Sequence, residues 1–115
     1  SQALEAVVGS ANMAEYKLKK PIVTGAGETI EVLNLDWDSL SFGDFSTVRR
    51  VRIMMGEVSA SDSVSPKLDN GLRIALAWVA AVKGTKGLVV EDCVRLSMLD
   101  TLELSDECFD DYLTA

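Results

Sequence analysis

The sequence has 115 residues, of which 48% are apolar and only two are proline, so it suits one folded domain and not a disordered chain. It has no histidine, which excludes Ser-His-Asp and Cys-His catalytic sites and removes the commonest metal ligand. The net charge is −7, and all of it lies in residues 91–115, which hold eight acids and one base. We therefore expect no catalytic site, no metal, no cofactor and no basic surface for nucleic acid.

The two cysteines, Cys93 and Cys108, form no C-x-x-C pair, and two sulfurs without histidine do not complete a zinc site. We expect free, buried thiols in a reducing compartment; a single disulfide is the alternative. The longest apolar run, Ile74 to Val82, has nine residues, whereas a membrane span needs about 20. Because the first residues also lack a secretory signal, a cytosolic protein without membrane contact is expected.

Residues 1–15 form a lead-in to the predicted domain. The short apolar run "ALEAVV" is isolated, and "MAEYKLKKP" from Met13 reads like a natural start. Residues 1–12 are therefore either a flexible extension or a remnant of cloning. Residues 16–115 are predicted to form a single globular α+β domain.

The stretch "YKLKKPIVTGAGETIEVLNL", residues 16–35, predicts a β-hairpin. Two strand-like runs flank a five-residue loop that contains Gly25 and Gly27. A dinucleotide-binding loop would need a third glycine where Ile30 stands, and it would open a helix. The loop is thus predicted to be a turn and not a phosphate site. Pro21 cannot donate to a strand ladder, so its strand lies at an edge or bends there.

A connector and a helix follow, over residues 36–56. Trp37 is predicted to anchor the core beneath the hairpin, and Ser41 with Asp44 resembles a capping box. Gly56 is a plausible helix end. The apolar residues of this helix recur at helical spacing and are Phe45, Val48, Val51 and Met55.

Three arginines on this helix form the first candidate binding cluster. Arg49 and Arg50 fall outside the apolar stripe and are expected in solvent. Together with Arg52 they are predicted either to bind a partner or to pair with the acidic residues 91–115 inside the fold.

Residues 66–84 predict the central helix, after a Ser-rich loop over residues 57–66. Its polar wedge is narrow, with Ala77 and Ala80 lying between the polar residues. A helix that is apolar nearly all round is buried on several sides, and a partner or a second copy could cover part of it. The broad apolar face, which Trp78 widens, holds Leu68, Leu72, Ala75, Leu76, Val79 and Val82.

The last 26 residues predict a short helix near Val90–Leu96, then Ser97 as a cap with Asp100 at the third position, then a final helix. The acids are placed on the solvent side of that helix. They are solvating charges, a docking surface for a basic partner, or a mimic of DNA. The predicted apolar stripe of the final helix holds Met98, Leu102, Phe109, Tyr112 and Leu113.

The order of hairpin followed by three or four packed α-helices, over about residues 16–113, resembles the small tail assembly chaperones of long-tailed phages of the Mu-like and P2-like kind. The matching features are a Leu-x-x-Pro strand, a Gly-containing hairpin, an Ile-x-x-Leu-x-Leu strand and a late Asp–Leu–Asp pattern. The residues that fit are Leu18, Pro21, Gly27, Ile30, Leu33, Leu35, Asp44, Asp92, Leu96 and Asp100.

The resemblance implies a non-enzymatic role in virion morphogenesis. Such proteins keep the long tape measure protein soluble in the bacterial host cytoplasm, help tail-tube protein to assemble on it, and are absent from the finished particle. This chain would be the short form of a frameshifted pair. The alternatives are a tail-completion or adaptor subunit, and an acidic inhibitor or DNA mimic. The residues predicted to contact a partner or a second copy are Arg49, Arg50, Arg52, Trp78, Phe109, Asp110, Asp111 and Tyr112.

Overall fold

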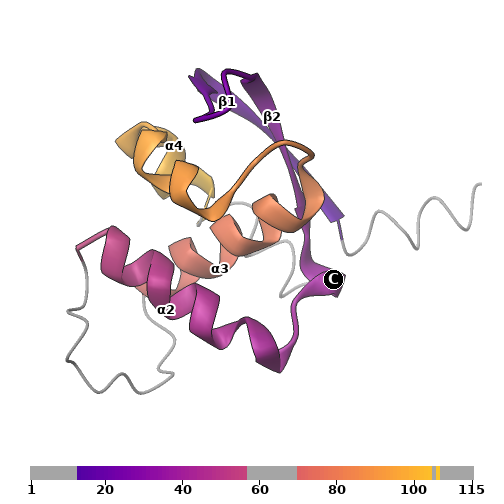
Figure 1. Cartoon of the computed structure of the whole chain (residues 1–115), viewed down its shortest axis with the longest axis vertical. Coiled ribbons are helices and arrows are strands. Elements are labelled where there is room, and N and C mark those ends of the chain that lie inside the picture. Colours follow the sequence, from indigo (N-terminus) through magenta and orange to yellow (C-terminus); the bar gives the residue numbers. More distant parts are fainter. Residues whose placement is uncertain (1–12, 57–69, 105, 107–115) are drawn as a thin grey trace, which may run out of the picture.

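The computed structural model describes residues 13–56, 70–104 and 106, and it confirms the α+β fold, with a hairpin followed by helices (Figure 1). Among these residues, no helix has the length and apolarity needed to cross a bilayer. The elements are β1 Met13–Val23, β2 Thr29–Asp36, the 3₁₀ helices η1 Trp37–Ser39 and η2 Phe42–Asp44, α2 Phe45–Met54, α3 Asn70–Gly84, the 3₁₀ helix η3 Val90–Arg95, and α4 Met98–Glu103.

The predicted hairpin is confirmed. β1 and β2 pair in antiparallel fashion, and the backbone N–H of Thr24 donates to the carbonyl of Glu28 at 2.8 Å. The N–H of Gly27 donates to the carbonyl of Thr24 at 2.9 Å, with Gly27 at φ 90°. A glycine is favoured there because residues with a side chain rarely adopt a positive φ. The "TGAGE" loop is therefore a hairpin turn.

β1 is irregular where Pro21 predicts a bend. Lys17 pairs with Val32, but the next pair is Ile22 with Ile30, so four residues of β1 lie opposite one residue of β2. Residues 18–21 are thus released from the ladder, as proline requires. The backbone N–H groups of Lys19 and Lys20 therefore find their acceptor outside the ladder.

The carboxylate of Asp100, on α4, is that acceptor. Its Oδ1 accepts from the N–H of Lys19 and from the hydroxyl of Tyr16, both at 2.9 Å. Its Oδ2 accepts from the N–H of Lys20 at 3.0 Å and from the Ser97 hydroxyl at 2.9 Å. Burial would raise the pKa of the fully buried Asp100 carboxyl, but these donors hold the pKa below its usual value. The buried carboxylate of Asp100 thus joins α4 to β1, which lies about 80 residues earlier in the sequence.

The buried position of Asp100 corrects the prediction for the final helix. Ser97 caps α4 as expected, because its hydroxyl accepts from the N–H of Asp100 at 3.1 Å. However, Asp100 and Leu104 are buried, while Met98 and Leu102 of the predicted apolar stripe are exposed. The competing factor is the group of N–H donors on β1, which turns the Asp100 side of α4 inward. The rest of the stripe lies outside the described residues.

A second buried carboxylate, Asp92 in η3, holds the tip of the hairpin. Its Oδ1 accepts from the N–H of Gly25 at 3.1 Å and pairs with Nε of Arg95 at 3.2 Å. Its Oδ2 accepts from the N–H of Val89 at 3.2 Å. The acids of residues 91–115 are therefore not uniformly on the solvent side, since Asp92 and Asp100 connect the helices to the hairpin.

The central helix α3 packs against β2 on one side and α2 on the other (Figure 1). The sequence placed Ala77 and Ala80 between the polar residues of this helix, but both are fully buried. Other elements therefore enclose α3 on more sides than its polar residues predicted. Its last residue, Gly84, lies so close to β2 that a Cβ would overlap the carbonyl oxygen of Asn34. The next residue, Thr85, uses its hydroxyl to accept from the N–H of Asn34 at 2.9 Å. The free edge of β2 is satisfied there.

The connector and α2 follow the local signals. Trp37 is buried in the core, as predicted. The Asp44 carboxylate accepts from the N–H of Ser41 at 2.8 Å, which confirms half of the capping box. Gly56 ends the helix at φ 75°. Phe45 departs from the predicted core stripe: it is exposed and meets Phe42 edge to face, with ring centroids 5.1 Å apart.

Replacing Asp100 with Asn should lower the free energy of unfolding by about 3 kcal/mol, because one amide oxygen cannot serve four donors. The matched control is Asp106→Asn, since Asp106 is an exposed acid of the same segment, and it should change stability by less than about 0.5 kcal/mol. Urea unfolding of both variants measures the difference. Equal effects would contradict the structural role of Asp100.

Stability should also fall in acid. Because the folded pKa of Asp100 lies below its unfolded value, the unfolded chain takes up the proton first as the pH drops below about 4. The stabilisation is present above that pH and is lost as the pH falls through the folded pKa. Urea midpoints between neutral pH and strong acid should therefore decline for the native sequence and decline less for Asp100→Asn. Parallel curves would contradict this assignment.

Replacing Gly84 with Ala should cost about 2–3 kcal/mol, despite the better helix propensity of alanine. The added Cβ would come within 2.8 Å of the carbonyl carbon of Asn34, so the end of α3 must move away from β2. Gly43→Ala is the control, because its Cβ would meet nothing nearer than the Ser41 hydroxyl at 3.7 Å. Thermal unfolding should distinguish the two, and a neutral Gly84→Ala would rule out this close approach.

Candidate functional site

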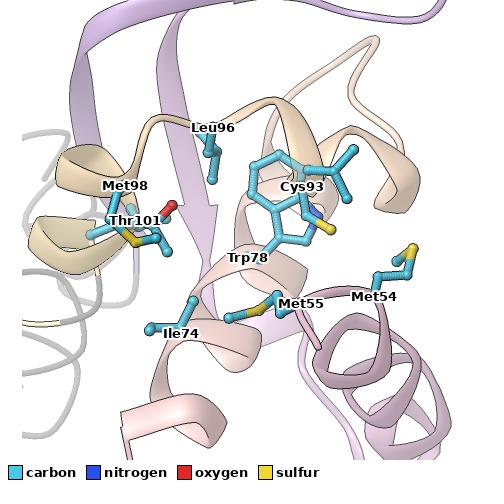
Figure 2. A pocket seen from close by; sticks show the side chains of 10 residues that line it. Met54, Met55, Ile74, Trp78, Cys93, Leu96, Met98 and Thr101 are labelled. Carbon is cyan, nitrogen blue, oxygen red and sulfur yellow. The ribbon is translucent and has the colours of Figure 1, made fainter. Parts of the chain in front are cut away.

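An apolar groove lies where α2, α3, η3 and α4 meet, and it encloses a cavity of about 300 Å³ (Figure 2). In Figure 2, Met54 and Met55 approach it from α2, while Met98 and Thr101 approach from α4. We call this feature the methionine groove. Its lining residues are Met54, Met55, Ile74, Trp78, Cys93, Val94, Leu96, Met98, Thr101 and Leu104.

The indole of Trp78 forms part of the lining and is fixed in place. It is 1% exposed, and its Nε1–H donates to the carbonyl of Val90 at 3.0 Å. Trp78 was predicted to contact a partner, and the structure places it where only a group that enters the groove would meet it. A buried indole with its donor satisfied presents apolar area to that group.

Three of the four methionines of the chain line this groove. Methionine is unbranched and polarizable, so it adapts to apolar surfaces of different shape and is common at surfaces that bind several sequences. The sequence prediction assigned Met55 and Met98 to core stripes and therefore missed the groove. The available signal was the pair Met54–Met55 at the end of an amphipathic helix.

Exposed apolar side chains extend the groove onto the surface. Val94 is 65% exposed and Met98 is 75% exposed, and both are lining residues. Leu99 and Leu102, on the same helix as Met98, are exposed as well. Single exposed apolar residues are ordinary, but a group of them beside an apolar cavity is typical of a binding surface.

The three arginines do not form one surface. Arg50 is exposed and pairs with Glu91 at 3.1 Å, so the predicted pairing with the acidic residues is confirmed for this residue. Arg49 is half-buried, and Arg52 is only 4% exposed. The prediction that Arg49 and Arg50 lie in solvent thus holds fully for Arg50 alone, and the Arg52 side chain is buried on the packed side of α2. Arg50 lies one turn before Met54 and thus near the groove.

The remaining predicted contacts, Phe109, Asp110, Asp111 and Tyr112, lie outside the described residues, as does Cys108. Closer to α4, Glu103 pairs with Lys19 and accepts from the Tyr16 hydroxyl at 3.2 Å. Lys19 is the main cause of the lowered pKa of Glu103. The pKa of Tyr16 is raised by burial and then by Asp100 and Glu103. These groups connect α4 to the hairpin and do not line the groove.

The ionisable group of the groove is a thiol in a poor position for reaction. Cys93 is a free, buried cysteine, and its pKa is raised by burial and then by the charges of Glu91 and Asp92. It is therefore protonated at neutral pH, whereas a nucleophilic cysteine needs a lowered pKa. In residues 13–56, 70–104 and 106, no group of three or more Cys, Asp or Glu side chains could hold a metal ion. What the groove offers is apolar contact.

Comparison of the chain with models of protein families, with curated proteins and with solved structures gives no match.

Proposed function

We propose that this protein is a non-enzymatic tail assembly chaperone whose methionine groove binds amphipathic helical segments of a phage tape measure protein. It keeps that partner soluble in the host cytoplasm until tail-tube protein displaces it, and it is absent from the finished particle. The observation that carries the proposal is the open apolar groove with three methionines in its lining. The resemblance described above supplies the identity of the partner.

The size of the groove suits side chains and not a whole helix. A cavity of about 300 Å³ is at the lower end of the range for small-molecule pockets, so it has room for one or two large side chains. A helix that lies across it would insert apolar anchors at positions i and i+3 or i+4. The exposed side chains of Val94, Met98 and Leu102 would cover the neighbouring part of that helix.

The composition of the groove suits a partner with many similar but non-identical sites. Flexible methionines re-pack around different anchors, which favours promiscuous binding over tight binding. A small apolar contact also gives modest affinity, and modest affinity permits displacement. Covering apolar stripes of an unassembled partner would suppress its aggregation.

Two observations weaken the alternative of an acidic inhibitor or DNA mimic. A mimic would present its acids to a basic groove, but Asp92 and Asp100 are buried and serve the hairpin. Glu91 and Glu103 are paired with Arg50 and Lys19. The alternative of a tail-completion or adaptor subunit differs in one observable property, because such a subunit remains in the finished particle.

Co-expression with the long helical protein encoded just downstream tests the proposal. That protein should stay soluble and co-purify, and the complex should survive about 0.3 M salt, because apolar contact is not screened. Val94→Glu, which places a charge in the groove lining, should weaken the complex about tenfold or more. Val23→Glu is the matched control, since Val23 is exposed on β1 and outside the groove lining, and it should leave binding unchanged.

Two results would count against the proposal. If the partner precipitates whether or not this chain is present, the chaperone function fails. If Val94→Glu and Val23→Glu weaken binding equally, the partner binds elsewhere and the methionine groove is not the site.

A further inference from the structure

We propose that Phe42 and Phe45 of one copy of this chain bind in the methionine groove of a second copy, so that the copies associate head to tail. We call these two residues the aromatic pair. The inference goes beyond the proposed function, because self-association needs no partner other than the chain itself. The groove then has a second ligand, which is a fixed part of the same protein.

The aromatic pair is the exposed aromatic surface of the described residues. Phe42 is 87% exposed and Phe45 is 44% exposed, whereas Tyr16, Trp37 and Trp78 are buried. The two rings meet edge to face, with centroids 5.1 Å apart and planes inclined at 73°. A single exposed apolar side chain is ordinary, but two packed rings in solvent are typical of a contact surface, because each ring can bury a large apolar area.

The turn that carries the aromatic pair is held in place. Phe42 begins η2 and Phe45 begins α2, so the two stand three residues apart, on the same side of a 3₁₀ turn. Asp44, between them, accepts from the N–H of Ser41 at 2.8 Å and pairs with Lys83 of α3 at 3.2 Å. A fixed turn therefore presents the pair, and little conformational entropy is lost when the pair binds.

The aromatic pair cannot enter the groove of its own chain. Phe45 begins α2 and Met54 ends it, so these residues lie nine positions apart, which is about 14 Å along the helix axis. Figure 1 shows the start of α2 on the side of the molecule away from α4, which forms one wall of the groove. Neither residue of the pair lines the groove. The pair can fill a groove only in another molecule.

The groove suits the aromatic pair in size and in chemistry. A cavity of about 300 Å³ has room for one or two large side chains, and the pair supplies two. Three methionines lie in the lining, and their thioethers make favourable contacts with aromatic rings at about 5 Å. The exposed side chains of Val94 and Met98 would cover the ring that does not enter the cavity.

The charges around the two surfaces are complementary. Residues 36–46, which surround the aromatic pair, hold three acids and no base, and Asp38 among them is exposed. Arg50, one turn before Met54, and Arg95, between two lining residues, flank the groove with guanidinium groups about half exposed. Each already pairs with one acid of its own chain. A guanidinium has five N–H donors, so each can bind a second carboxylate.

The same charges disfavour symmetric contacts. Two aromatic pairs face to face would bring the acids of residues 36–46 together. Two grooves face to face would bring Arg50 and Arg95 of both copies together, and no side chain would fill the cavities. The contact therefore joins unlike surfaces, so a dimer still has one free aromatic pair and one free groove, and association continues beyond the dimer.

The contact is weak and reversible. Two phenylalanine side chains bury about 300–500 Å², which is below the ~800 Å² per partner of a stable complex. The copies should therefore associate at high concentration and separate on dilution. Weak self-association also leaves the groove accessible to a partner with better anchors.

Sedimentation equilibrium of the full chain tests the association. Between about 10 µM and about 1 mM protein, the mean mass of the native chain should rise steadily and pass that of a dimer. Phe42→Ser with Phe45→Ser, here the serine variant, should raise the apparent dissociation constant about tenfold or more, and Val94→Glu should do the same from the groove side. Val23→Ser is the control, because Val23 is exposed on β1 and outside both surfaces.

Two results would overturn the proposal at this stage. One is a native chain that stays monomeric over the whole range, and the other is a serine variant that associates as the native chain does. Phe42→Ser alone guards against a loss of folding, since this position is 87% exposed. It should weaken association in the same direction while the thermal unfolding midpoint stays that of the native chain.

A mixture of two variants distinguishes unlike from like surfaces. The serine variant keeps its groove and Val94→Glu keeps its aromatic pair, so each alone should remain monomeric. Their mixture should form a heterodimer with the native affinity and stop there, because no further complementary surface is left. Association of either variant alone would indicate a symmetric contact, and a mixture that stays monomeric would exclude the contact between pair and groove. Both results contradict the proposal.

Methionine methyl groups report where the rings go. The serine variant carries ¹³C-methionine, and the unlabelled Val94→Glu chain is added to it. The ring currents of the added aromatic pair should shift the signals of Met54, Met55 and Met98, whereas Met13, at the start of β1 and outside the lining, keeps its position. An added chain that carries all three changes should shift nothing. Equal shifts at all four methionines, or none, would rule out binding in the groove.

The outcomes for self-association and for the proposed function are separable. If the two variants form the heterodimer while the tape measure protein does not bind, the proposed function fails and the self-association stands. If that partner binds while the mixture stays monomeric, only the present inference fails.

Discussion

The carboxylate of Asp100 is the interaction on which the rest of the fold depends. A two-stranded hairpin is marginal by itself, and this one has an interrupted ladder at Pro21. Asp100 accepts the released N–H groups of Lys19 and Lys20 and so fixes α4 against β1. Since α4 carries Met98 and is followed by Leu104, the same carboxylate also positions one wall of the methionine groove. A polar interaction on one side of α4 thus determines the apolar surface on its other side.

Local sequence signals predicted the parts of this fold that depend on near neighbours. The hairpin turn needs a positive φ at Gly27, the end of α2 needs one at Gly56, and both positions are glycine. Ser97 and Asp100 stand at the spacing of a helix cap, and the cap is present. In each case the hydrogen-bond partners are separated by three or four residues, so the interaction can be predicted from the sequence without knowledge of the fold.

The parts that could not be predicted depend on contacts across the chain. The sequence alone predicts that Asp100 is a solvated acid, because the N–H groups that donate to it lie on β1, 80 and 81 residues away. Its burial rotates α4, and the rotation exposes Met98, which periodicity alone had placed in the core. The groove was missed for the same reason, because its described lining comes from four elements and the residues directly after three of them, and each region contributes only two or three side chains. Of the predicted partner contacts that lie within the described residues, Trp78 belongs to that lining, and Arg49, Arg50 and Arg52 do not.

The pairing of Tyr16 with Asp100, 84 residues apart, has a consequence for the order of folding during synthesis. At about 5–20 residues per second, the ribosome needs roughly 4–17 s to extend the chain from the first residue of this pair to the second. Through that interval the Asp100 carboxylate is not yet present to accept from the N–H groups of Lys19 and Lys20, so β1 cannot yet be fixed against α4. Contacts of such long sequence separation also slow folding in general. The nascent chain is then itself an unassembled apolar surface, exposed until one of its last helices emerges.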